Sequence, residues 1–199
     1  MKSFPAVLVA SLFLGVSTLT AEPLAVGAPV PAAAVRTVAG EATDLRAALG
    51  GRPTVLIFYR GGWCPYCTRH LAALGEIEGD LRAAGFQLVA LSPDRPEKLR
   101  AKPAAAGLGY TLLSDSKAEA MRALGIAFRV EEALVATYKD RYGIDLEADS
   151  GETHHLLPHP AVFIVDAGGV IRFAHVNPDY RVRLTGDEIL AAARATLGK

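Results

Sequence analysis

The sequence predicts a single α/β domain in which helices flank a central mixed β-sheet. Three observations predict this class. Apolar runs of strand type alternate with segments of helical periodicity from residue 53 to residue 126. Two later apolar runs meet at a tight turn, and 199 residues suffice for one core of ordinary size. With 51% apolar and 21% charged residues, the chain is too apolar to be disordered.

Residues 1–21 have the layout of a secretory signal peptide. Lys2 precedes an apolar run that ends at Leu19, and small and polar residues follow. The run is shorter than the roughly 20 residues that a helix needs to cross a bilayer, so we expect no stable membrane insertion after the leader is removed. We therefore expect a periplasmic or otherwise exported protein, cleaved near Ala21, with residues 22–199 as its domain. Retention as an uncleaved anchor is the alternative, because Leu19 suits such a cleavage site poorly.

An arm, a short helix and a buried strand open the expected domain. Prolines within residues 23–42 indicate an extended arm or a small hairpin. Residues 43–49 are typical of a short helix that Gly50 ends. The apolar run 53–59, PTVLIFY, suits a central strand that is buried on both faces.

Helices and strands alternate in the middle of the chain. Apolar residues at helical spacing predict one long helix over 67–84, and residues 86–91 return to a strand, which completes a strand–helix–strand unit. A helix follows Pro96, and residues 110–113 are extended. A capping box at 116–119 opens the next helix.

The last third of the chain predicts a helix, a loop, a hairpin and a final helix. Residues 131–142 have a helical pattern, whereas 142–160 lose periodicity and indicate a long surface loop. The apolar runs 161–165 and 170–175 predict a β-hairpin. A second capping box, at 185–188, begins the last helix.

Charge and cysteine content exclude two classes of protein. The 21 Lys and Arg residues balance 21 Asp and Glu residues, so the chain lacks a broad cationic field and we expect no nucleic-acid partner. Two cysteines are too few for a scaffold held by several disulfides. The core must therefore come from apolar burial, and any role of sulfur is local.

Those two cysteines stand where the buried strand passes through a glycine turn into a helix. Cys64 at a helix start lies among unpaired backbone N–H groups at the positive end of the helix dipole, which favour the thiolate and lower the thiol pKa. Pro65 suits the first helical turn, and the spacing puts Cys67 within disulfide reach. Trp63 and Tyr66 would shape the entrance. We predict a redox-active dithiol.

Other interpretations of the pair are a static disulfide, two buried thiols and half of a zinc site. A disulfide that closes so small a loop removes little entropy from the unfolded chain, and zinc would need two more ligands. His154, His155 and His159, with Glu152 nearby, are candidate ligands, but their spacing matches no recognised zinc motif. We expect no metal and no organic cofactor.

The segment FYRGGWCPYC at 58–67, followed by the expected helix and FQLVALSPD, resembles the peroxiredoxin-like proteins of the alkyl hydroperoxide reductase and thiol-specific antioxidant (AhpC/TSA) family. The similarity extends through residues 111–126 and 161–176. It implies a thioredoxin-like fold and a hydroperoxide substrate. It also implies that one cysteine becomes a sulfenic acid, a second condenses with it, and a thioredoxin-type protein reduces the disulfide.

Two departures from that family bear on the roles of the cysteines. Alignment puts Arg60 at the usual proline, Cys64 at the usual threonine and Cys67 at the peroxidatic cysteine. By comparison with thioredoxin, Cys64 would be the exposed attacking thiol and Cys67 the resolving one, and the helix-dipole argument also favours Cys64 as the more acidic thiol. The resemblance favours Cys67 as the sulfur that meets peroxide, and both assignments stay open. The family's arginine before the FIVD-like strand is also absent, since Pro160 stands there.

Basic residues near the dithiol have two interpretations each. Arg60 and Arg69 would either stabilise a thiolate or lie solvated on the surface. His70, one helical turn beyond Cys67, is interpreted as a packing residue.

Pro160 also resembles the cis-proline of thioredoxin-like proteins, which faces the dithiol beside the substrate backbone. His159 next to it would then stabilise a thiolate when protonated. We count Trp63, Pro65 and Tyr66 with these two as candidate substrate-binding residues. WCPYC and Pro160 favour a rival function, a thiol–disulfide oxidoreductase acting on protein disulfides. A metal-carrying binding module is a third hypothesis.

Overall fold

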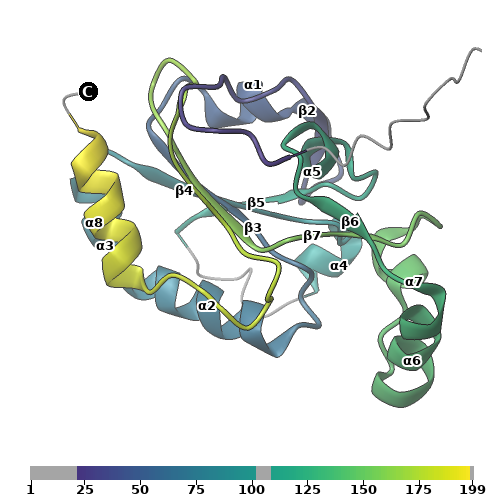
Figure 1. Ribbon diagram of the computed structural model, residues 1–199. Helices are drawn as coiled ribbons and strands as arrows, with labels where there is room; N and C mark the ends of the chain where they lie inside the picture. Colours follow the sequence, from purple (N-terminus) through teal and green to yellow (C-terminus); the bar gives the residue numbers. More distant parts are fainter. Residues whose placement is uncertain (1–21, 102–108, 198–199) are drawn as a thin grey trace, which may run out of the picture.

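A computed structural model describes residues 22–101 and 109–197. Its centre is a seven-stranded mixed sheet in the order β2-β1-β5-β4-β3-β8-β9, and β6 pairs with β7 in a second, two-stranded sheet (Figure 1). The strands are β1 (Ala34–Thr37), β2 (Ala42–Asp44), β3 (Thr54–Phe58), β4 (Gln87–Ser92), β5 (Thr111–Ser114), β6 (Ala127–Arg129), β7 (Leu156–Pro158), β8 (Ala161–Val165) and β9 (Ile171–Val176). The helices are α1 (Leu45–Leu49), α2 (Pro65–Glu76), α3 (Glu78–Ala83), α4 (Pro96–Arg100), α5 (Glu119–Ala123), α6 (Glu132–Tyr142), α7 (Leu146–Ser150) and α8 (Gly186–Thr196).

The strand that leads into the cysteine pair lies in the middle of the large sheet. β3 pairs in parallel with β4 and antiparallel with β8, and every residue of β3 and β8 is buried. This burial explains the continuous apolar runs of both strands. The predicted strand–helix–strand unit and the mixed sheet are confirmed, and the fold is thioredoxin-like.

Helices cover both faces of the sheet and enclose two apolar clusters. α2, α3 and α8 lie on one face, and α1 and α5 lie on the other (Figure 1). Alternate residues of β3 serve the two clusters, as the strand pleat requires. Val55 and Ile57 pack with α2, α3 and α8. Leu56 and Phe58 pack with α1 and α5.

Several local predictions are confirmed. The proline-rich arm leads into an antiparallel β1–β2 hairpin, and β8 and β9 form the second hairpin. Gly50 ends α1 in the left-handed conformation, with φ at 59°. The capping box between Thr185 and Glu188 begins α8.

The long helix predicted over 67–84 is wrong in one respect, because it breaks at Ile77 into α2 and α3. Gly75 and Gly79 flank the break, and glycine weakens a helix interior. The Ile77 side chain packs closely on the start of α8, where a Cβ added to Gly186 would lie 3.0 Å from its Cγ2. The break therefore lets α3 and α8 pack together on the same face.

The capping box predicted for α5 at residues 116–119 is also wrong. Ala118 is the N-cap and provides no side-chain hydrogen bond. The carboxylate of Asp115 accepts the backbone N–H groups of Ala120 at 3.0 Å and Met121 at 2.8 Å instead. A buried acid thus performs the capping that the sequence pattern assigned to a serine.

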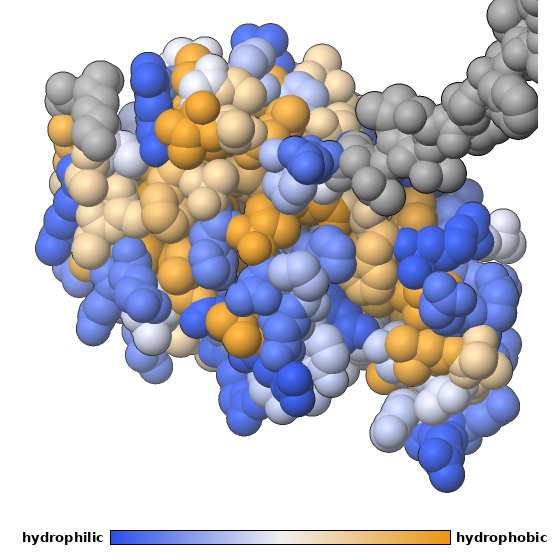
Figure 2. Space-filling view, viewed as in Figure 1, coloured by the Kyte–Doolittle hydropathy of each residue, from blue (hydrophilic) through white to orange (hydrophobic). Residues whose placement is uncertain are grey.

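The segment 142–160 is not an irregular loop. The Asp145 carboxylate caps α7 by accepting the N–H of Ala148, and β7 pairs antiparallel with β6. α6 and α7 project beside the end of the sheet at which α2 begins (Figure 1). α6 carries no buried residue, and a small apolar area lies over α6 and α7 on an otherwise mainly hydrophilic part of the surface (Figure 2). Within residues 22–101 and 109–197, none of the helices has the length and apolar character that crossing a membrane requires.

Candidate active site

The two cysteines lie where β3 gives way to α2, as predicted. Cys64 is the N-cap of α2 in extended conformation, and Pro65 occupies the first helical position. The carbonyl of Cys64 accepts the N–H of Thr68 at 3.0 Å, which closes the first turn. Cys67 lies inside that turn, so both sulfurs belong to one short, rigid piece of backbone.

The loop before Cys64 is held by the chain that follows β4. The carboxylate of Asp94 accepts the N–H of Gly62 at 2.7 Å. Gly61 has φ at 151°, and a Cβ added there would lie 2.4 Å from Nε1 of Trp63. The glycine turn of the sequence therefore lets Trp63 fold back against the loop.

Both thiols are free and almost fully buried. Cys64 and Cys67 are each 1% exposed and join the apolar cluster that includes Tyr59 and Leu71. The expectation of an exposed attacking sulfur is therefore wrong for this conformation. The two side chains nevertheless contact each other, because each has the largest effect on the pKa of the other.

That contact shifts the pKa values of the two thiols in opposite directions. Interaction with the Cys67 thiol lowers the pKa of Cys64 to about 6, although burial opposes this shift. Interaction with Cys64, together with burial, raises the pKa of Cys67. The pair therefore loses its first proton easily and holds its second proton tightly, and the two sulfurs share the proton that remains. Near neutral pH the pair carries one negative charge.

Arg183 reaches the pair from the segment between β9 and α8. Its Nη2 donates to Sγ of Cys67 at 3.4 Å. The two residues are 116 positions apart, and no local pattern marks Arg183, so sequence reasoning missed it. Only the fold brings this cation to the sulfur.

The charged side chain of Arg60 is buried beside the dithiol, and the residue is 4% exposed. Its interpretation as a solvated surface residue is therefore wrong. It donates to the hydroxyl of Tyr138. Its guanidinium lies 5.0 Å from the ring centre of Trp63, 5.7 Å from that of Tyr138 and 4.3 Å from that of Tyr180. Aromatic faces stabilise a desolvated cation, so three rings hold this one in place.

Tyr66 and Arg69 lie at the outer edge of the same group of side chains. The Tyr66 ring packs edge-on against Tyr180 at 5.5 Å, and the guanidinium of Arg69 lies 4.8 Å from the Tyr66 ring centre. Arg69 and Pro65 are exposed, whereas Tyr66 is half-buried. The structure thus brings Trp63, Pro65 and Tyr66 to the dithiol, as expected.

His159 and Pro160 are placed differently from the prediction. The His159–Pro160 bond is trans, so the expected cis-proline is wrong. The His159 ring stacks on Phe128 at 4.5 Å and lines a groove with Arg122 and Val176. The backbone N–H of His159 donates to Ile126, which ties this residue to the β6 side of the molecule. Pro160 itself is buried and immediately precedes β8.

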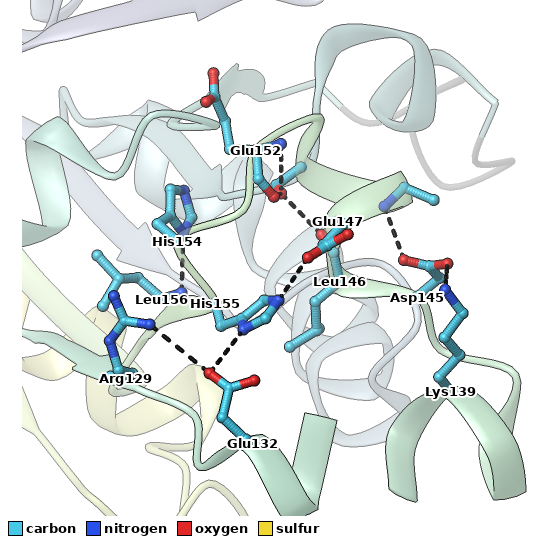
Figure 3. A network of polar contacts seen from close by, with 12 residues as sticks. Arg129, Glu132, Lys139, Asp145, Leu146, Glu147, Glu152, His154, His155 and Leu156 are labelled. Atoms are coloured by element: carbon cyan, nitrogen blue, oxygen red, sulfur yellow. Dashed lines mark hydrogen bonds and ion pairs between the residues drawn. The ribbon is translucent and has the colours of Figure 1, made fainter. Parts of the chain in front are cut away.

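The histidines that suggested a metal site have other partners. His154 lies 2.7 Å from the Ser116 carbonyl. His155 lies between Glu132 at 3.3 Å and Glu147 at 2.9 Å (Figure 3). These contacts join α6, α7 and the chain before β7. Across the described ranges, no group of three or more His, Cys, Asp or Glu residues is arranged to hold a metal ion.

A thioredoxin-like sheet with two thiols at the start of the helix that follows its central strand defines a thiol-dependent oxidoreductase. Residues 26–174 match the AhpC/TSA family, and the chain belongs to that family. It is a peroxiredoxin-type oxidoreductase, a thiol peroxidase by homology.

Three similar proteins illustrate the relationship. A Mycobacterium tuberculosis (strain ATCC 25618 / H37Rv) protein whose name places it among the peroxiredoxins is 32% identical over 136 residues, which are 68% of this chain and 73% of that protein. Peroxiredoxin Bcp of Escherichia coli K12 is 27% identical over 140 residues, which are 70% and 77% of the two chains. Reduced Prx3 of Vibrio vulnificus, crystallised with hydrogen peroxide, has a TM-score of 0.69 at 20% identity and covers 85% of this chain and 99% of its own. The last similarity concerns the fold.

Proposed function

We propose that this peroxiredoxin-like protein reduces hydroperoxides through a reversible dithiol–disulfide cycle between Cys64 and Cys67. The observation that supports this cycle is the direct interaction of two free thiols in one helical turn, where each has the largest effect on the pKa of the other. Hydrogen peroxide and organic hydroperoxides are the proposed substrates, and a thioredoxin-type protein is the proposed reductant. Trp63, Pro65 and Tyr66 would line the approach.

The cycle balances with the groups that are present. The thiolate of the pair attacks one peroxide oxygen, the O–O bond breaks, and the sulfur becomes a sulfenic acid. The remaining thiol gives its proton to the departing alkoxide or hydroxide. Its thiolate then displaces hydroxide from the sulfenic sulfur and forms the disulfide. A dithiol protein restores both thiols by exchange and becomes oxidised itself.

Burial of the sulfurs favours a peroxide over a protein disulfide as the oxidising substrate. At 1% exposure each, neither sulfur of the dithiol form is accessible to another protein, so the proposed protein reductant requires a movement of the site after oxidation. A small peroxide needs much less room. The trans bond before Pro160 also removes one reason for the rival oxidoreductase function.

Single-turnover stopped-flow with hydrogen peroxide tests the peroxidase proposal. We expect the reduced protein to be oxidised far faster than free cysteine, with one disulfide formed per peroxide consumed. The Cys64→Ser and Cys67→Ser variants should each stop before the disulfide. Oxidation no faster than that of free cysteine would reject the peroxidase, and rapid reaction with a protein disulfide instead would support the oxidoreductase.

Export is a separate part of the proposal, and the leader-like residues 1–21 support it. An oxidising compartment tends to keep such a cysteine pair in the disulfide form, so an exported enzyme requires a dedicated reductant. Cell fractionation and the mass of the mature protein test this part. A full-length chain in the cytoplasm would contradict it.

A further inference from the structure

The donors around the two sulfurs are unequal. Nη2 of Arg183 donates to Sγ of Cys67 at 3.4 Å, and the backbone N–H of Arg60 also acts on that sulfur, lowering a pKa that Cys64 and burial raise. The backbone N–H of Cys67 and the charges of Arg60 and Arg183 also lower the pKa of Cys64. Among the described residues, however, the direct guanidinium–sulfur hydrogen bond goes to Cys67. The helix start therefore favours a charge on Cys64, and the directly bonded guanidinium of Arg183 favours a charge on Cys67.

Arg183 is placed for a charged partner. Its Nε is buried and has no hydrogen-bond partner among the described residues. A partly desolvated guanidinium is unfavourable unless a negative charge compensates it. The Cys67 sulfur is the acceptor within reach, so a thiolate at Cys67 satisfies both groups.

The surrounding chain fixes the Arg183 segment against the site. The N–H of Asn177 donates to the Pro160 carbonyl at 3.1 Å, and the Tyr180 ring packs between Tyr66 and Arg60. On the other side of Arg183, the capping box of α8 begins within two residues. The chain on both sides of Arg183 is therefore fixed, and this fixed backbone positions the guanidinium against the sulfur.

The neighbouring His70 does not compete for the charge. Burial, followed by the proximity of Arg183, lowers the pKa of His70 to about 4. The imidazole is therefore neutral near pH 7. It neither repels Arg183 nor offers an alternative cation to the Cys67 sulfur.

We propose that Arg183 draws the shared negative charge of the dithiol onto Cys67, which makes Cys67 the sulfur that attacks peroxide and Cys64 the sulfur that resolves. The proposal rests on the peroxidase function above and deepens it. Arg183 contacts the reacting sulfur. When the O–O bond breaks, the departing oxygen becomes negatively charged, and Arg183 is also placed to stabilise that charge. In the AhpC/TSA family an arginine precedes the strand that corresponds to β8, and this chain has Pro160 there. Arg183, which follows β9, supplies a cation in its place.

Single-thiol variants separate the two sulfurs. Cys64→Ser leaves Cys67 alone, and Cys67→Ser leaves Cys64 alone. Each is combined with Arg183→Met, Arg183→Lys or the control Arg181→Met, whose exposed guanidinium pairs with Asp179 at 2.9 Å. Far-ultraviolet absorbance of the thiolate against pH gives the pKa of the remaining sulfur, and stopped-flow gives its rate with hydrogen peroxide.

We expect Arg183→Met to raise the pKa of Cys67 by about one unit and to slow its oxidation by roughly tenfold or more. Arg183→Lys should restore part of the lowered pKa and part of the oxidation rate of Cys67. Arg181→Met should change neither the pKa nor the rate. The same substitutions should act less on Cys64, because the charge of Arg183 influences that sulfur without the direct hydrogen bond that Cys67 receives. Faster peroxide oxidation of Cys64 than of Cys67, or an equal effect of Arg183→Met on both sulfurs, would overturn the proposal.

Failure of the peroxidase function gives a different result. If neither sulfur outreacts free cysteine with peroxide, the thiolate titration still shows whether Arg183 holds the charge on Cys67. Thermal unfolding of every variant controls for misfolding, and the Arg183→Lys variant retains a cation if the methionine variant does not fold.

Discussion

The cysteine pair carries a single charge near neutral pH because the two thiols in contact lose their first proton with a pKa of about 6 and share the proton that remains. An alkylating agent reacts with the thiolate, so its rate follows the fraction ionised. We predict that the rate of iodoacetamide alkylation rises as pH increases through about 6 and is nearly constant above pH 7. A rate that continues to rise towards the ordinary thiol pKa of about 8.5 would contradict the shared-proton arrangement.

Asp115 is a second residue whose burial has a measurable consequence. Burial raises its pKa from 3.8 to about 7, although backbone N–H groups of α5 oppose the shift. The folded state then binds a proton that the unfolded state has lost, so folding stability falls as pH rises from about 4 to about 7. The slope from this group is on the order of 1 kcal/mol per pH unit.

An Asp115→Asn variant tests this dependence. The amide oxygen can still accept an N–H at the start of α5 but does not titrate. We expect chemical denaturation at several pH values to show that the decline between pH 4 and 7 is lost in Asp115→Asn and retained in the control Asp187→Asn, an exposed acid in α8. The same pH profile in wild type and Asp115→Asn would assign the decline to other groups.

At the level of elements, the loop between β3 and α2 depends on one glycine. A Cβ at Gly61 would lie 2.4 Å from Nε1 of Trp63 and 3.0 Å from Oδ1 of Asp94. We predict that Gly61→Ala lowers the free energy of unfolding by about 1–3 kcal/mol and displaces Trp63. Thermal unfolding and tryptophan fluorescence measure the two effects.

Gly79 provides the matched control for that substitution. It lies in α3 with no atom within 4 Å of an added Cβ. Gly79→Ala should leave stability unchanged or raise it by up to about 1 kcal/mol, because alanine favours a helix. Equal effects of the two substitutions would show that the Trp63 contact is unimportant.

The elements that the sequence predicted well are those with strong local signals. The apolar run of β3, the β8–β9 hairpin and the capping box of α8 are all found. The missed elements depend on distant partners: β7 exists because β6 pairs with it, and α3 separates from α2 where Ile77 packs on α8. Local periodicity does not contain such contacts.

The candidate site divides in the same way. The strand–turn–helix context of WCPYC is local, so the dithiol and its aromatic neighbours could be found from sequence. Arg183 comes from beyond β9 and Tyr138 from α6, and neither has a local signature. The burial of both sulfurs is likewise a property of the packed chain, which is why an exposed thiol was expected.

For the whole molecule, oxidation should change how tightly the segment 177–185 is held. In a disulfide neither sulfur is charged, so the partly buried guanidinium of Arg183 loses its compensating partner. A reductant must also reach sulfurs that are 1% exposed in the closed state. Loosening of this segment after oxidation would meet both requirements.

Amide hydrogen exchange followed by mass spectrometry measures this loosening. We predict faster exchange over 177–185 in the disulfide form than in the dithiol form, while the central strand β3 stays equally protected in both. The reduced Arg183→Met protein should exchange as the oxidised wild type does, because it lacks the same ion pair, and Arg181→Met should not. If the dithiol and disulfide forms exchange equally over 177–185, the charge of Cys67 does not control this segment, and the reductant must reach the disulfide by movement of another wall of the site, such as α6.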